Sequence, residues 1–169
     1  MQPVLRTRII GLGNPILGDD GIGWRVAEQI EKEIEAKRNL YPHLSIDIQM
    51  FSLGGLSLME QMIDTDAVIL IDAIQTGHHP IGSVYKLGLH DLPNFSAAHT
   101  TSAHDTSLQN ALQAGRLMGA HLPEIIHIVA IEVEKVYEFS DQLSPPVEQA
   151  IPLACQAVWD YLSELEAIR

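Results

Sequence analysis

The stretch IIGLGNPILGDDGIG, residues 9–23, shows most directly how this chain folds. A short apolar run at residues 8–12 is typical of a buried strand. The GLGNP that interrupts it is a turn signal, because glycine and proline break regular structure. Beyond the two acids of the stretch, from Gly21 to Lys37, apolar residues recur at helical spacing. The stretch therefore predicts a strand, a tight turn carrying two acids, and a helix.

The rest of the chain alternates in the same way and shows no internal repeat. Pro152 falls inside the apolar pattern of the last helix, so we expect it to kink that helix or to mark its true start. Strands that alternate with helices predict a three-layer α/β/α fold, with a mostly parallel twisted sheet covered by helices on both faces. We expect one domain over residues 1–169. The predicted strands are 8–12, 44–51, 67–71, 83–87 (nearer an edge) and 125–131, and the predicted helices are 21–37, 56–63, 107–118 and one opened by Pro145-Pro146.

Composition narrows the function classes. The only cysteine is Cys155, which excludes an intrachain disulfide and a cysteine-rich zinc site and favours a reducing compartment. The N-terminal residues contain no long apolar run, so we expect a cytoplasmic protein with neither a signal peptide nor a membrane partner. The formal net charge of −12 disfavours contact with phosphate backbones, so no nucleic-acid partner is expected.

Chemistry-bearing residues gather where the strands of the predicted sheet end. Asp20 follows the first strand, Asp72 closes the apolar run at 67–71, and His104 lies in a polar stretch just before a predicted helix. In open parallel sheets, sites lie outside the carboxyl ends of the strands. Two carboxylates and one imidazole suit nickel, zinc, iron or manganese and leave coordination positions open, and the same trio suits general acid–base work.

Structural roles for the same residues remain open at this point. Asp20 could cap the helix that starts at Gly21, because acids are common in a first helical turn. Asp72 could cap the loop after its strand, and His104 could be an ordinary surface histidine.

Three other motifs favour structural interpretations. His78-His79 lies in a loop expected to be exposed, so we do not assign it a metal. Cys155 has no base near it in sequence and is expected to be a small core residue. The glycines at 11–13 do not form a dinucleotide loop, because Ile16 stands where a third glycine is required and two acids would repel a pyrophosphate.

The chain resembles the hydrogenase maturation endopeptidases. The resemblance lies in four segments, which follow one another in the order of that family and at similar spacing: residues 9–23, Gly54-Gly55, Ile71-Asp72-Ala73 and the His104 segment. The resemblance implies an enzyme that removes a C-terminal extension from the large-subunit precursor of a nickel–iron hydrogenase after nickel insertion. It implies Asp20, Asp72 and His104 as catalytic and metal-contacting residues, with nickel supplied by the substrate and no organic cofactor. Many members have an acid and a threonine where Leu53 and Leu56 flank the glycine pair.

Two alternatives have different consequences. GLGNP also resembles the start of peptidyl-tRNA hydrolase, but the Thr-Arg-His-Asn stretch of that family is missing and the negative charge opposes a tRNA partner. A nickel-binding assembly factor would hold the hydrogenase precursor without cutting it. That alternative predicts a metal-dependent complex without any change in precursor mass.

Overall fold

The computed structural model describes residues 4–94, 107–134 and 138–168. Its strands form one sheet in the order β2-β1-β3-β5-β4. β1 pairs in parallel with β2 and β3, and β3 pairs in parallel with β5. β4 is antiparallel to β5 and lies at the edge, as expected for this segment. The mostly parallel sheet is thus confirmed. The strands are β1 Leu5–Leu12, β2 Leu44–Phe51, β3 Ala67–Ile74, β4 Val84–Gly88 and β5 Ile125–Glu132.

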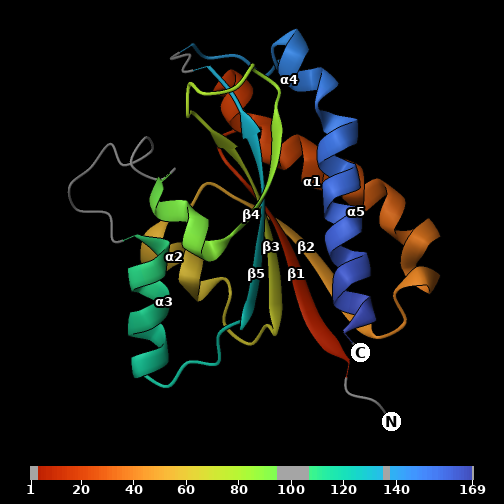
Figure 1. The fold of residues 1–169 in the computed structure, drawn as a ribbon, viewed down its shortest axis with the longest axis vertical. Helices are drawn as coiled ribbons and strands as arrows, with labels where there is room; N and C mark the ends of the chain where they lie inside the picture. The colour runs from red at the N-terminus through yellow and green to blue at the C-terminus, as the bar shows by residue number, and fades with distance from the viewer. Residues whose placement is uncertain (1–3, 95–106, 135–137, 169) are drawn as a thin grey trace.

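Helices cover both faces of the sheet, as Figure 1 shows. The first apolar cluster joins one face to α1, α4 and α5, and the second joins the opposite face to α2 and α3. The predicted three-layer α/β/α architecture is therefore confirmed. None of the helices in the described ranges is both long and apolar enough to span a bilayer. The helices are α1 Ile22–Lys37, α2 Gly55–Glu60, α3 Leu108–Leu117, α4 Pro145–Gln149 and α5 Ile151–Ala167, with 3-10 turns η1 Gly18–Gly21, η2 Arg38–Leu40 and η3 Leu89–Asn94.

The last helical pattern of the sequence divides into two helices. α4 ends at Gln149, and α5 begins at Ile151 with Pro152 in its first turn. Proline is tolerated there because its missing N–H would have no partner inside the helix. Pro152 therefore marks the start of the long helix and does not kink it.

Glycines let the chain fold tightly between β1 and α1. A Cβ on Gly23 would lie 2.3 Å from the carbonyl oxygen of Leu12 and 2.4 Å from that of Ile71, so the first turn of α1 rests directly on the backbones of β1 and β3. Gly13 has a φ of 121°, and a Cβ there would lie 1.8 Å from the carbonyl oxygen of Asp20. These close approaches hold η1, the turn that carries both acids, over the carboxyl ends of β1 and β3.

Candidate active site

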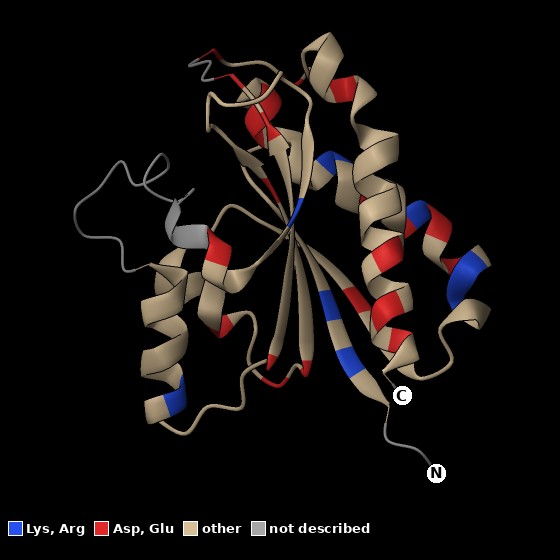
Figure 2. Ribbon diagram, viewed as in Figure 1, with Lys and Arg blue, Asp and Glu red and all other residues tan. Residues whose placement is uncertain are grey.

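Asp20 lies on η1, and its carboxylate folds back on the loop that precedes it. Asp20 Oδ2 accepts a hydrogen bond of 2.8 Å from the backbone N–H of Asn14. The N-cap of α1 is Gly21, and no side chain caps that end of the helix. The capping role that the sequence left open for Asp20 is therefore not what the structure shows. In Figure 2 the acidic segment η1 lies at the carboxyl end of the sheet, whereas the arginines of β1 lie toward the opposite end.

Asp72 lies inside β3 and does not close it. β3 continues to Ile74 because β5 pairs with it along its whole length, with Asp72 opposite Ala130. The predicted strand end at residue 71 was therefore wrong. The register between β1 and β3, in contrast, stops at Gly11 and Ile71. Asp72 is thus the first residue of β3 beyond its pairing with β1.

The side chain of Asp72 belongs to the face of the sheet that α2 and α3 cover. Val68, Leu70 and Ile74 lie in the apolar cluster of that face. Residues at even spacing along a strand share a face, so Asp72 lies with them. Asp72 Oδ1 accepts a hydrogen bond of 2.8 Å from the N–H of Ala73, and Oδ2 accepts none from the residues that the structure describes.

The two acids interact electrostatically. The pKa of Asp72 is raised from its ordinary value of 3.8 to about 7, first by burial and second by the negative charge of Asp20, while the hydrogen bond from Ala73 opposes both effects. The influence of Asp20 shows that the structure brings together two of the three site residues that the sequence predicts. A carboxyl with a pKa near 7 can take up and release a proton at neutral pH, as a general base or acid must.

His104 lies outside the described residues, so its role stays a prediction. The description resumes at Ser107, whose hydroxyl accepts a hydrogen bond of 3.3 Å from the N–H of Asn110 and caps α3. Within residues 4–94, 107–134 and 138–168, no three His, Cys, Asp or Glu side chains form a group that could hold a metal ion. The predicted ligand set includes His104 and is not tested by that finding.

Asp19 has a role that the sequence did not indicate. It is buried, and its carboxylate accepts two hydrogen bonds of 2.7 Å from Ser144, one from the backbone N–H and one from the hydroxyl. Ser144 is the N-cap residue of α4. Asp19 therefore ties the turn that carries Asp20 to the C-terminal helices. No signal in the sequence separates it from Asp20, since the two are neighbours of the same type.

Glu132 is a buried acid at the end of β5 that the sequence did not single out. Oε1 accepts hydrogen bonds from the N–H groups of Thr76 and Gly77, and Oε2 accepts them from the hydroxyls of Thr76 and Tyr85. Burial works to raise the pKa of Glu132, but these bonds outweigh burial and lower it. The signal was available, because Glu132 follows the apolar run 125–131 as Asp72 follows 67–71.

Two structural interpretations made from the sequence agree with the structure. His78 and His79 are exposed in the loop between β3 and β4. Cys155 is buried in the core beneath α5. The pKa of the Cys155 thiol is raised to about 11, first by burial and second by the charge of Glu33, while Lys37 opposes both effects. A thiol in this state is a poor nucleophile, so Cys155 does not compete with the acids as a catalytic group.

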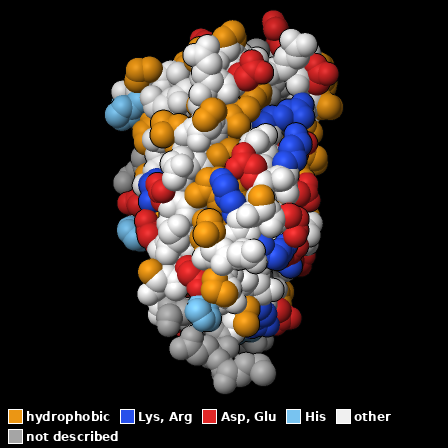
Figure 3. Space-filling view, turned by 90° about the vertical axis from the view of Figure 1, so that its right-hand side faces the viewer, with side chains coloured by type: hydrophobic (Ala, Val, Ile, Leu, Met, Phe, Trp, Pro, Cys, Tyr) orange, Lys and Arg blue, Asp and Glu red, His pale blue; other side chains and the backbone are white. Residues whose placement is uncertain are grey.

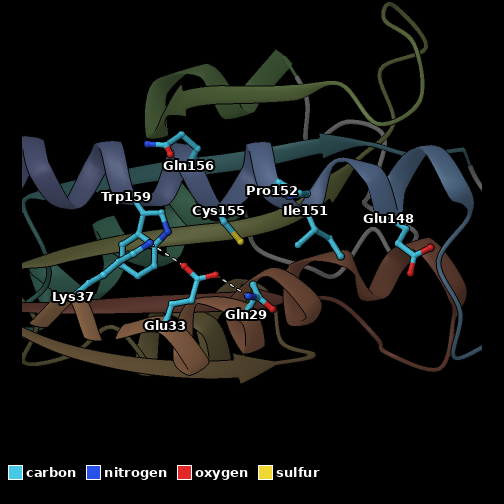
Figure 4. A pocket seen from close by; sticks show the side chains of 9 residues that line it. All are labelled: Gln29, Glu33, Lys37, Glu148, Ile151, Pro152, Cys155, Gln156 and Trp159. Carbon is cyan, nitrogen blue, oxygen red and sulfur yellow. Dashed lines mark hydrogen bonds and ion pairs between the residues drawn. The ribbon is translucent and has the colours of Figure 1, made fainter. Parts of the chain in front are cut away.

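A groove of about 430 Å³ runs between α1 and α5, on the opposite face of the sheet from Asp72 (Figure 4). Several of its polar side chains are paired. Glu33 accepts hydrogen bonds from Gln29 and Lys37, and the Lys37 ammonium lies 4.0 Å from the centre of the Trp159 ring. Figure 3 shows this side of the molecule, where hydrophobic side chains are interspersed with charges of both signs. We therefore interpret the groove as a seam between two packed helices.

Comparison with known proteins identifies the class. The family model for hydrogenase maturation proteases matches residues 24–161, which include Asp72 and begin just after Asp20. The chain is 29% identical to the hydrogenase 2 maturation protease of Escherichia coli K12 over 97% of this chain and 96% of that protein. It is also 29% identical to a hydrogenase expression/formation protein of Rhizobium leguminosarum bv. viciae, over 91% of this chain and 72% of that protein.

A solved structure agrees with these relatives. The hydrogenase-maturating endopeptidase of E. coli superposes with a TM-score of 0.71 at 26% identity, over 95% of this chain and 93% of that one. The family model, the relatives and the solved structure thus agree on one class of protein, with a mostly parallel α/β fold. The chain belongs to the hydrogenase maturation protease family, and its activity is that of a peptidase.

Proposed function

We propose that this protein is the endopeptidase that removes the C-terminal extension of a nickel–iron hydrogenase large-subunit precursor once nickel has been inserted. In this proposal Asp20, Asp72 and His104 contact the nickel that the substrate carries, and no organic cofactor takes part. The observation that supports the proposal most is the pair of acids, Asp20 and Asp72, at the open edge of the sheet of a hydrogenase maturation protease.

The donor chemistry of the pair fits a cation brought in by the substrate. Two carboxylates that repel each other are stabilised by a cation between them, because the cation attracts both negative charges. Asp72 Oδ2 also has no hydrogen-bond donor among the described residues, so a lone pair is available. An incomplete protein ligand set would make cleavage depend on nickel already being in the precursor.

Peptide hydrolysis needs a polarised carbonyl and an activated water, and a bound metal ion can supply both. The protein itself supplies a proton acceptor. In the proposed step, water attacks the scissile carbonyl carbon while Asp72 takes a proton from it, and Asp72 then gives that proton to the leaving nitrogen as the C–N bond breaks. Without a bound cation the pKa of Asp72 is about 7, and a nickel ion beside it would lower that pKa and favour the form that accepts a proton.

The test is a processing assay with purified large-subunit precursor, with and without nickel, followed by mass spectrometry. We expect a C-terminal peptide to be lost only from the nickel-loaded precursor. Asp20→Asn, Asp72→Asn and His104→Ala should each reduce processing by at least about 100-fold, the usual scale for loss of a general base or a metal ligand. His79→Ala is the matched control, since His79 is exposed in another loop, and it should process normally.

Each result separates the proposal from its alternatives. A stable, nickel-dependent complex without any loss of mass would favour the assembly factor over the protease. Processing by Asp72→Asn at the wild-type rate would remove Asp72 from the site. Equal cleavage of nickel-free and nickel-loaded precursor would overturn the role of nickel while leaving the protease in place.

A further inference from the structure

Four exposed hydrophobic side chains lie on segments near the turn that carries Asp20, three of them on loops and Leu56 in the first turn of α2. They follow β1, β2 and β5, and the carboxyl ends of these parallel strands meet at one edge of the sheet. We call these residues the apolar rim: Ile16 (54% exposed), Leu53 (39%), Leu56 (50%) and Phe139 (84%).

Hydrogen bonds between the loops hold the rim around Asp20. On one side, Ser140 donates its N–H to the carbonyl of Ile16 at 3.0 Å, and Gly18 donates its N–H to the carbonyl of Ser140 at 2.7 Å. Phe139 is therefore held beside the loop of Ile16. On the other side, the Ser52 hydroxyl donates to the carbonyl of Gly13 at 2.5 Å, which holds the loop of Leu53 against the turn of Asp20.

The backbone of one rim loop is open to a partner chain. Gly54, between Leu53 and Leu56, is extended with φ −144° and ψ 176°, and no atom lies within 4 Å of where its Cβ would be. Its N–H donates to no acceptor in the described part of the chain. An extended peptide can pair with such a backbone and place alternate side chains against neighbouring apolar groups.

We propose that the apolar rim binds the precursor residues that flank the scissile bond, in extended conformation and through their apolar side chains. This inference rests on the proposed function. The loops of Ile16, Leu53 and Phe139 carry or contact the turn of Asp20, so they lie next to a peptide bond held at Asp20 and Asp72. Several exposed apolar side chains gathered beside a polar site are typical of a binding surface for a protein partner.

The chain offers a matched control at the other end of the molecule. Leu117 and Met118 lie at the end of α3 and are 83% and 86% exposed. The segment that follows them is joined to the end of α2 by a hydrogen bond from the N–H of Asp64 to the carbonyl of His121. That position is at the amino end of the strands, away from the acid pair. Met118→Ser therefore removes as much exposed apolar surface as Phe139→Ser without touching the rim.

The experiment has two readouts. The first is the dissociation constant for nickel-loaded precursor, measured on Asp72→Asn protein so that the substrate is not consumed. The second is KM and kcat for processing, measured on protein with an intact Asp72. Leu56→Ser and Phe139→Ser should each raise the dissociation constant and KM about tenfold, as expected for loss of one buried apolar side chain, with kcat changed less than about twofold. Met118→Ser should change none of these.

The outcomes distinguish the rim from the proposed function. Unchanged affinity and KM in both rim variants would overturn the rim and leave the protease standing. Binding that depends on the rim, in a protein that never cleaves the precursor, would overturn the protease and leave the rim standing. If sedimentation shows a wild-type dimer that Phe139→Ser converts to a monomer, the rim is an interface between copies of this chain and the inference is wrong.

Discussion

Replacing Asp72 by asparagine is expected to stabilise the folded protein, and by more at pH 8 than at pH 5. The pKa of Asp72 is about 7 in the folded protein against an ordinary value of 3.8. As pH rises between these two values, the unfolded chain has released its proton while the folded protein still holds it. Stability is therefore lost as pH rises through this window, at about 1.4 kcal/mol per pH unit for a fully separated pair of pKa values. Asparagine cannot ionise and does not pay this penalty.

The magnitude follows from the width of the window. Between pH 5 and pH 8 the penalty on the wild-type protein grows by about 2 to 3 kcal/mol, most of it before pH 7. Because Asp72 is only partly buried, the lower figure is the better expectation. Asp20→Asn should reduce the pH dependence without abolishing it, since burial is the larger cause of the raised pKa and the charge of Asp20 is the second.

The assay is urea unfolding of the wild-type and Asp72→Asn proteins at both pH values, in a chelating buffer that keeps the site free of metal. Equal m-values would show that the same surface is exposed on unfolding. Asp160→Asn, which removes one negative charge from the exposed side of α5, controls for net charge. A stability difference that is the same at pH 5 and pH 8, or that is larger at pH 5, would refute the reasoning.

Three further changes test the frame around the site by urea or thermal unfolding. Asp19→Ala should cost about 2 to 4 kcal/mol, because it leaves the N–H and the hydroxyl of Ser144 without an acceptor, whereas Ser144→Ala should cost about 1; equal losses would contradict the pairing. Gly23→Ala should destabilise the protein by several kcal/mol, because the new Cβ would collide with two strand carbonyls. Gly54→Ala, the control, should change the stability by less than about 1 kcal/mol. If Gly23→Ala were as stable as the wild-type protein, α1 would have to be able to move away from the sheet. Glu132→Gln should cost about 2 kcal/mol at pH 7, and the loss should shrink as pH falls through the lowered pKa of Glu132; a loss independent of pH would argue against an ionised Glu132.

Most of the fold could be predicted because the buried faces of helices and strands place apolar residues at regular spacing in the sequence. The strand predicted over 44–51 and the apolar positions of α1 agree with the structure because each element shows one face to the core. The end of β3 could not be predicted in the same way. Ladder bonds to β5 keep Asp72 and the next two residues in the strand, and backbone pairing of that kind does not depend on the polarity of a side chain.

The site was predictable only as far as topology determines it. Parallel strands bring Asp20 and the neighbourhood of Asp72 to one edge whatever the side chains do. The roles of Asp19 and Glu132 depend instead on tertiary contacts. The partner of Asp19 lies 125 residues away in the chain, and Glu132 needs donors from both Thr76 and Tyr85. No local pattern contains such information.

Glu132 and Asp72 lie on the neighbouring strands β5 and β3, toward the same edge of the sheet, yet their environments differ. Glu132 receives hydrogen bonds on both oxygens, and its pKa is lowered. From the residues that the structure describes, Asp72 receives one hydrogen bond, from a backbone N–H, and burial and the negative charge of Asp20 raise its pKa. In the folded protein both oxygens of Glu132 accept hydrogen bonds, whereas Oδ2 of Asp72 accepts none from the described residues and lies near the negative charge of Asp20. Two neighbouring negative charges lower the stability of the folded protein unless a cation or a proton binds to them. For this reason we assign a catalytic role to Asp72 and a structural role to Glu132.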